Sequence, residues 1–146
     1  MNLCTKSINH LLMKTKTKIL LVRLAGAVSI VFTLFHAAFY WLFNWAQTLT
    51  VMNPTDRAIM LTFSLLCTLL ILYSVMVAFF HTRALFETST GKSLSLFFST
   101  FYLMRIVCEF AYFGFSIPGS LIIIALCLLP AICFGLPVLL KTKEKE

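Results

Sequence analysis

The chain has 146 residues, of which 60% are hydrophobic and only 12% are charged. Soluble domains are about a quarter charged, so this composition excludes an ordinary soluble protein and indicates an integral membrane protein. The net charge of +7 does not indicate a nucleic-acid partner, because the lysines and arginines gather at the ends of apolar runs rather than over a polar surface.

Residues 1–18 form a basic segment ahead of the first apolar run, and we expect this segment in the cytoplasm. Met13, which precedes Lys14, offers an alternative start to Met1, and nothing below depends on the residues between them.

The first apolar run, residues 19–45, is longer than the 7 to 15 apolar residues of a cleavable signal peptide, so we expect a retained membrane-spanning helix. Its polar side chains recur every three or four residues, which places them on one helix face that should turn inward. They are Ser29, Thr33, His36, Tyr40 and Asn44. An aromatic belt at the outer interface is predicted from Phe39, Tyr40, Trp41, Phe43 and Trp45.

The second predicted span covers residues 58–80. Asn53 can cap a helix and Pro54 suits the first helical position, so the helix itself should begin near Pro54. One face is built mainly from small side chains that allow close helix packing. It comprises Ser64, Cys67, Thr68, Ile71 and Ser74.

The third predicted span covers residues 94–115, with Ser93 as its N-cap. It contains Arg105 and Glu109, one helical turn apart, although an ionised side chain at the bilayer centre costs about 2.5 to 3.5 kcal/mol. Tyr102 and Tyr112 share their helix face.

The depths of three ionisable residues predict a buried polar cluster. Taking Phe32 and Arg105 as the middles of the two spans, His36 and Glu109 each lie about 6 Å toward the outer side. His36, Arg105 and Glu109 are therefore expected to meet. Two interpretations are open: Arg105 and Glu109 neutralise each other and only fix the helix register, or the cluster forms a proton, ion or ligand site.

The fourth predicted span covers residues 120–140, after a tight turn at residues 116–119, and residues 141–146 form a charged cytoplasmic tail. Backbone groups inside a bilayer must be satisfied internally, so each span is expected to be helical. The predicted fold is all-α: one domain, residues 19–140, forming a four-helix transmembrane bundle of two helical hairpins. Lysine and arginine dominate both terminal segments and the middle loop, which predicts a multi-pass cell-membrane protein with both termini cytoplasmic.

The sequence carries no motif for a metal, a cofactor or a catalytic nucleophile. Thr90-Gly91-Lys92-Ser93 lacks the second glycine of a phosphate-binding loop, and the five cysteines have no metal-binding or disulfide pattern, so they are expected to pack as small apolar residues.

These observations favour a non-enzymatic membrane protein that binds a ligand or partner or assembles as a homo-oligomer or with another membrane protein. The alternatives are a small proton-coupled transporter or carrier of a small or anionic solute, and an intramembrane lipid-modifying enzyme. The candidate ligand-binding or proton-relay residues are His36, Arg105, Glu109, Tyr40, Asn44, Tyr102 and Tyr112.

Overall fold

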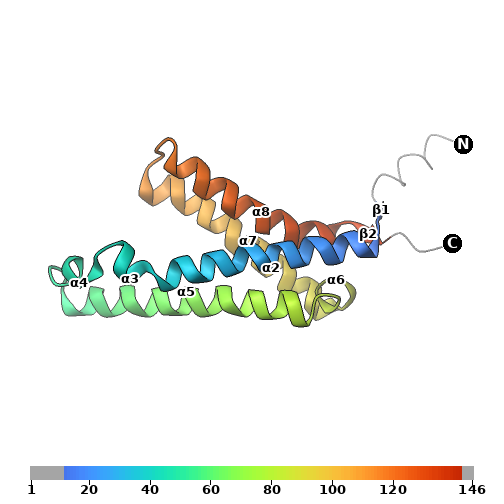
Figure 1. The fold of residues 1–146 in the computed structure, drawn as a ribbon, viewed down its shortest axis with the longest axis horizontal. Helices are drawn as coiled ribbons and strands as arrows, with labels where there is room; N and C mark the ends of the chain where they lie inside the picture. The colour runs from blue at the N-terminus through green and yellow to red at the C-terminus, as the bar shows by residue number, and fades with distance from the viewer. Residues whose placement is uncertain (1–11, 143–146) are drawn as a thin grey trace, which may run out of the picture.

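The computed structural model describes residues 12–142 and is almost entirely helical (Figure 1). Four helices are long and apolar enough to cross a membrane, which fits a multi-pass membrane protein. They are α2 (Thr15–Ala37), α5 (Pro54–Phe80), α7 (Ser89–Cys108) with its π-helical continuation η1 (Glu109–Phe113), and α8 (Gly119–Leu139).

Short elements connect these helices. α3 (Phe39–Leu42) and α4 (Trp45–Thr48) join α2 to α5, and α6 (Ala84–Glu87) joins α5 to α7. At the end of the bundle opposite α3 and α4, the two-residue strands β1 (Leu12–Met13) and β2 (Lys141–Thr142) pair in parallel (Figure 1). The chain therefore enters α2 and leaves α8 at the same place.

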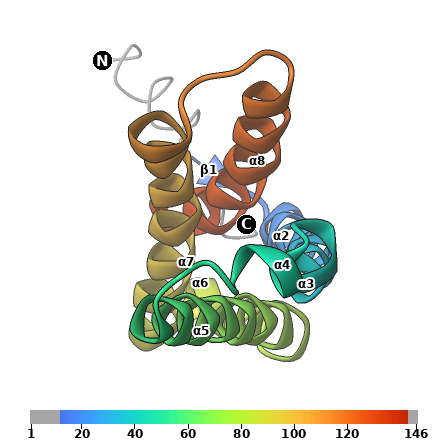
Figure 2. The same ribbon diagram turned by 90° about the vertical axis from the view of Figure 1, so that its left-hand side faces the viewer.

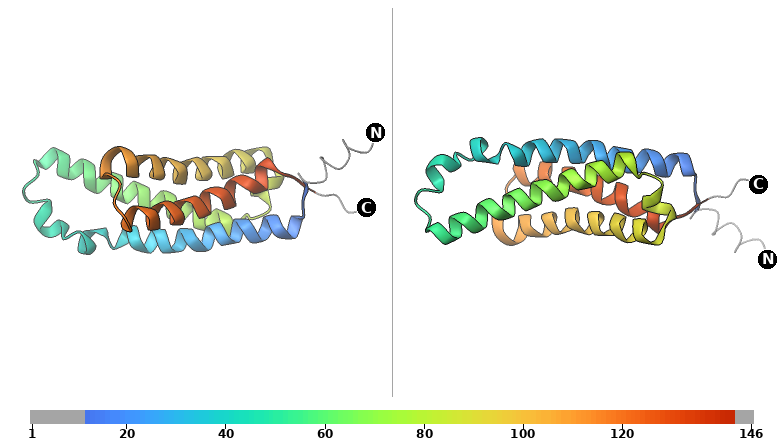
Figure 3. Two further views of the ribbon diagram at one scale, coloured as in Figure 1. Left: turned by 90° about the horizontal axis from the view of Figure 1, so that it is seen from above. Right: turned by 90° about the horizontal axis from the view of Figure 1, so that it is seen from below.

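The long helices pack in a defined set of pairs. α2 lies along α5, α7 lies along α8, and α2 also packs against α8, whereas α5 and α7 make little direct contact (Figure 2). The α2 and α5 pair projects beyond the turn between η1 and α8 (Figure 3). α5 and α7 are therefore joined by side-chain contacts such as that of Tyr73 with Phe98 rather than by close backbone packing.

Small residues and inter-helix hydrogen bonds set these pairings. A Cβ atom on Gly26 would lie 2.8 Å from the Cβ of Ala78, so α2 and α5 approach closely only because residue 26 is glycine. Between α7 and α8, the Ser95 hydroxyl donates to the Phe134 carbonyl at 2.8 Å and the Ser99 hydroxyl to the Ala131 carbonyl at 2.7 Å. The small face predicted on α5 does face inward, since none of its five side chains is exposed.

The sequence predicted the start of α5 correctly, whereas α7 and α2 begin earlier than predicted. α5 begins at Pro54, as expected, with the Asn53 side chain accepting from the Asp56 N–H at 2.9 Å. α7 begins at Ser89 instead of after Ser93, because the Thr88 hydroxyl caps it by accepting from the Gly91 N–H at 3.0 Å. α2 begins at Thr15, so the last residues of the predicted basic segment are helical.

The first long helix ends at Ala37 and does not continue to residue 45. Phe39 packs edge-on against Phe35 and Phe43, at centroid distances of 5.0 and 5.1 Å, and Asn44 adopts the left-handed conformation with φ of 48°. The aromatic run thus folds into the short helices α3 and α4, with Trp45 buried and Tyr40, Trp41 and Phe43 exposed.

Candidate functional site

The Arg105 and Glu109 side chains form an ion pair within their own helix, as one of the two interpretations of the sequence expected. The Arg105 Nη1 group donates to Glu109 Oε2 at 2.9 Å. The guanidinium also lies over the Phe113 ring, 4.8 Å from its centroid. The arginine side chain is 31% exposed and that of the glutamate 5%, so the carboxylate is the more deeply buried partner.

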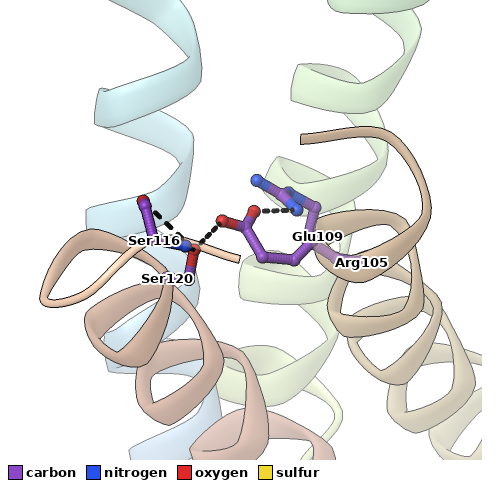
Figure 4. A network of polar contacts seen from close by, with 4 residues as sticks. All are labelled: Arg105, Glu109, Ser116 and Ser120. Carbon is purple, nitrogen blue, oxygen red and sulfur yellow. Dashed lines mark hydrogen bonds and ion pairs between the residues drawn. The ribbon is translucent and has the colours of Figure 1, made fainter. Parts of the chain in front are cut away.

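Glu109 also connects α7 to α8. The Ser120 hydroxyl donates to Glu109 Oε1 at 2.8 Å and accepts from the Ser116 N–H at 3.0 Å (Figure 4). Each carboxylate oxygen therefore has a partner, and the glutamate, at the start of η1, ties the end of this helix to the start of α8 (Figure 4). Ser120 was not predicted as part of the site, because a serine at the first turn of a helix usually serves as a cap.

The helix bounds place the ion pair nearer one end of its helix than expected. The midpoint of Ser89–Phe113 is Phe101, so Arg105 lies about 6 Å and Glu109 about 12 Å from it along the helix axis. Arg105 is therefore not at the middle of its span. This position lowers the cost of carrying the charge, because that cost falls toward the membrane surface.

His36 lies at the last turn of α2, where two contacts fix its ring. Its Nδ1 atom is 2.9 Å from the Phe32 carbonyl, and the ring stacks on Phe39 with centroids 4.4 Å apart. Because a carbonyl only accepts, Nδ1 carries the proton, which leaves Nε2 of the neutral ring as a hydrogen-bond acceptor.

A cavity of about 200 Å³ brings His36 and Arg105 together. All four long helices line it: α2 and α5 contribute His36 and Cys67, and α7 and α8 contribute Arg105 and Cys127. We call this space the four-helix cavity. Its full lining is Phe32, His36, Cys67, Ile71, Phe101, Tyr102, Met104, Arg105, Cys108 and Cys127.

The predicted three-residue cluster is therefore divided. His36 and Arg105 line the four-helix cavity, whereas Glu109 is not among its lining residues and instead holds Arg105 and Ser120. The cluster was expected to meet as one group. The separation follows from Ser120, which draws the carboxylate toward α8.

Of the other polar residues predicted to face inward, Tyr102 lines the cavity and Thr33 does not. Tyr102 is buried, lines the cavity and contacts Ser29 with its hydroxyl 2.7 Å from the Ser29 oxygen. Since the Ser29 hydroxyl donates to the Ala25 carbonyl at 2.8 Å, the tyrosine is the donor in this inter-helix bond. The Thr33 hydroxyl makes a hydrogen bond within its own helix, donating to the Ser29 carbonyl at 2.9 Å.

Tyr40, Asn44 and Tyr112 do not line the four-helix cavity. Tyr40 and Asn44 lie beyond the end of α2, so they do not continue the polar face of that helix, and both are exposed. The Asn44 side chain donates to Gln47 at 2.7 Å. Tyr112 lies in η1 and is 82% exposed, because the wider π-helical turn changes the residue spacing on which its predicted face depended.

Three cysteines, Cys67, Cys108 and Cys127, line the four-helix cavity. Cys67, Cys108, Cys127 and Cys133 are free thiols, and Cys4 lies outside the described residues. Within residues 12–142, no group of three His, Cys, Asp or Glu side chains is placed to hold a metal ion. The chemical resources of the cavity are thus a guanidinium, an imidazole, thiols and apolar walls.

Comparison with known proteins adds no family assignment: no family model matches the chain, and neither curated proteins nor solved structures give a significant match.

Proposed function

We propose that this protein binds a small, neutral, lipophilic molecule in the four-helix cavity and recognises one polar oxygen of that molecule. The observation that supports the proposal is the shared cavity, whose lining includes Arg105 and His36 among otherwise mainly apolar side chains. Binding sites of this kind combine apolar walls with a few polar groups that fix orientation.

The size of the cavity limits the ligand. A cavity of about 150 Å³ can hold a benzene molecule, so about 200 Å³ is enough for one ring with small substituents. A longer ligand would have to extend out of the cavity.

The electrostatics favour a neutral ligand over an anion. Glu109 already balances the charge of Arg105, so an added carboxylate would meet a nearby negative charge. A hydroxyl group suits both polar walls: its oxygen accepts from Arg105 and its proton goes to His36 Nε2. Glu109 itself is less suited to carrying protons, because both of its oxygens accept hydrogen bonds.

Three related ring compounds test this proposal on the protein in lipid nanodiscs: 4-propylphenol, propylbenzene and 4-propylbenzoate. Because a hydrogen bond to a charged group contributes about 1.5 to 3 kcal/mol, the phenol should bind about 10-fold or more tightly than propylbenzene. The replacements Arg105→Gln and His36→Phe should each remove most of this preference. Arg57→Gln, an exposed arginine outside the cavity lining, is the matched control.

A third variant keeps the test decisive if Arg105→Gln disturbs folding. Cys67→Phe fills the cavity without changing either polar group and should abolish binding of both neutral compounds. Absence of saturable phenol binding, tighter binding of the benzoate, or unchanged affinity in Cys67→Phe would overturn the proposal.

We also propose that both termini are cytoplasmic, with α2 and α5 forming one hairpin and α7 and α8 the other. The charge distribution supports this orientation: near β1 and β2 lie Lys14, Lys16, Lys18, Arg83, Lys92 and Lys141, with Glu87 the one acidic residue described at that end. At the opposite end of the bundle, the first turn of α5 carries Asp56 with Arg57. Homo-oligomerisation and a partner membrane protein stay predictions.

A further inference from the structure

A second hollow lies between α5, α6 and the start of α7, with a volume of about 630 Å³. It shares no lining residue with the four-helix cavity. Val77 and Leu85 are buried in it, and Met76 and Phe80 line it with half or more of their surface exposed. We call this hollow the inner groove, because it lies at the end of the bundle proposed to face the cytoplasm.

Two local features shape the inner groove. A Cβ on Gly91 would lie 1.8 Å from the Ala84 carbonyl oxygen, so the backbone of α6 touches α7 there and leaves α5 apart from α7. Farther along, Tyr73 of α5 meets Phe98 of α7 edge to face, with centroids 6.1 Å apart. From His81 to Tyr73 the groove runs about 12 Å along α5.

The two ends of the inner groove differ in chemistry. Toward Tyr73 the lining is apolar, whereas His81, Thr88 and Thr90 supply polar side chains at the other end. Exposed Arg83 directly precedes the lining residue Ala84 at this polar end. The groove therefore combines an apolar channel with a polar end that has an exposed arginine beside it.

We infer that the inner groove binds an anionic phospholipid, with one acyl chain against α5 and the phosphate at the polar end, beside Arg83. The excess of basic residues at this end of the bundle complements an anionic headgroup. A groove about 12 Å long that ends at Tyr73 suits a flexible chain better than a packed helix, which would need a longer seam.

The test compares retention of phosphatidylglycerol and phosphatidylcholine by the full chain in mixed micelles, measured by native mass spectrometry. Each cation near a membrane surface contributes about 1 kcal/mol to anionic lipid binding. The variant Arg83→Gln should therefore lose about 5-fold of its preference for phosphatidylglycerol. The matched control, Lys92→Gln, removes one charge from the same end, at a position on the opposite face of α7 from the lining residue Leu94.

Filling the groove tests the position of the acyl chain. Ala84→Trp should abolish retention of phosphatidylglycerol, while Leu65→Trp, on an exposed part of α5 outside both hollows, should not. If Ala84→Trp fails to fold, Met76→Trp on the groove wall replaces it.

Three results would overturn the inference: equal loss of lipid in Lys92→Gln, wild-type retention in the groove-filled variant, or displacement of the lipid by inorganic phosphate alone. Arg105→Gln should leave lipid retention unchanged, so this test is independent of the proposed ligand in the four-helix cavity.

Discussion

Lys18 is the clearest case of a residue whose role depends on a distant part of the chain. Its side chain is only 2% exposed, and its ammonium group donates to the Leu140 carbonyl at 2.6 Å at the end of α8. The Phe86 ring lies beneath the charge at 5.7 Å. From the sequence, Lys18 was the last residue of a basic solvated segment, and no local pattern distinguishes it from Lys16.

Replacing Lys18 by methionine should destabilise the protein. Methionine keeps an apolar stem but leaves the Leu140 carbonyl without this donor, so the free energy of unfolding should fall by about 1 to 3 kcal/mol. Equilibrium unfolding in mixed micelles measures the change. Lys16→Met is the control because Lys16 is exposed, and an equal effect of both substitutions would contradict the proposed contact.

Glu109 should act mainly as a connection between α7 and α8. Glutamine presents one acceptor oxygen in place of two, so Glu109→Gln cannot keep both the Arg105 and the Ser120 bonds in their present form. The unfolding temperature should fall, and phenol binding should weaken less than in Arg105→Gln. Glu87→Gln, at an exposed position, controls for loss of charge; an unchanged unfolding temperature in Glu109→Gln would argue against the connecting role.

At the scale of the elements, the contact between α2 and α5 depends on one glycine. A methyl group at residue 26 would meet Ala78 at 2.8 Å and the Phe79 ring at 3.0 Å. Gly26→Ala should therefore force the helices apart and destabilise the fold by about 1 to 3 kcal/mol in an unfolding titration.

A compensating substitution makes this prediction specific. Ala78→Gly removes the nearest atom, so the double variant should regain part of the lost stability. Gly119→Ala is the matched control, since its new methyl group would meet only Ser116 at 3.6 Å. No rescue by Ala78→Gly would mean that the cost arises elsewhere.

The elements were predictable where composition and periodicity determine them. Apolar runs located all four long helices, and Asn53 with Pro54 located the start of α5. The end of α2 was not predictable in this way, because Phe39 to Trp45 is apolar enough to continue a span. The helix instead ends at Ala37, where aromatic packing around Phe39 accompanies the change to α3, and the left-handed Asn44 separates α3 from α4; both features depend on three-dimensional contacts.

In the candidate site, the ion pair was predictable from the sequence, whereas the positions of His36 and Ser120 relative to it were not. The spacing of Arg105 and Glu109 gave their ion pair, since residues four apart face each other on a helix. The predicted contact of this pair with His36 depended on Phe32 and Arg105 being the middles of their spans. The observed bounds of the third helix place its midpoint at Phe101 instead. The hydrogen bond from Ser120 to Glu109 was not predictable, because it depends on the turn between η1 and α8, which brings the serine hydroxyl back to the carboxylate.

For the whole molecule, the proposed orientation predicts the location of two fusion points. A fluorescent protein that folds only in the cytoplasm should fluoresce when fused after residue 146, while a phosphatase active only outside should be inactive there. The same phosphatase inserted after Met52, between α4 and α5, should be active. The reverse pattern would contradict the orientation drawn from the charge distribution.

The pairing of β1 with β2 and the bond from Lys18 to Leu140 also constrain biosynthesis. Lys18 and Leu140 are 122 residues apart, and chains are synthesised at about 5 to 20 residues per second. For about 6 to 24 s, α2 must therefore exist with its lysine uncovered, until α8 has been synthesised and can close this end of the bundle.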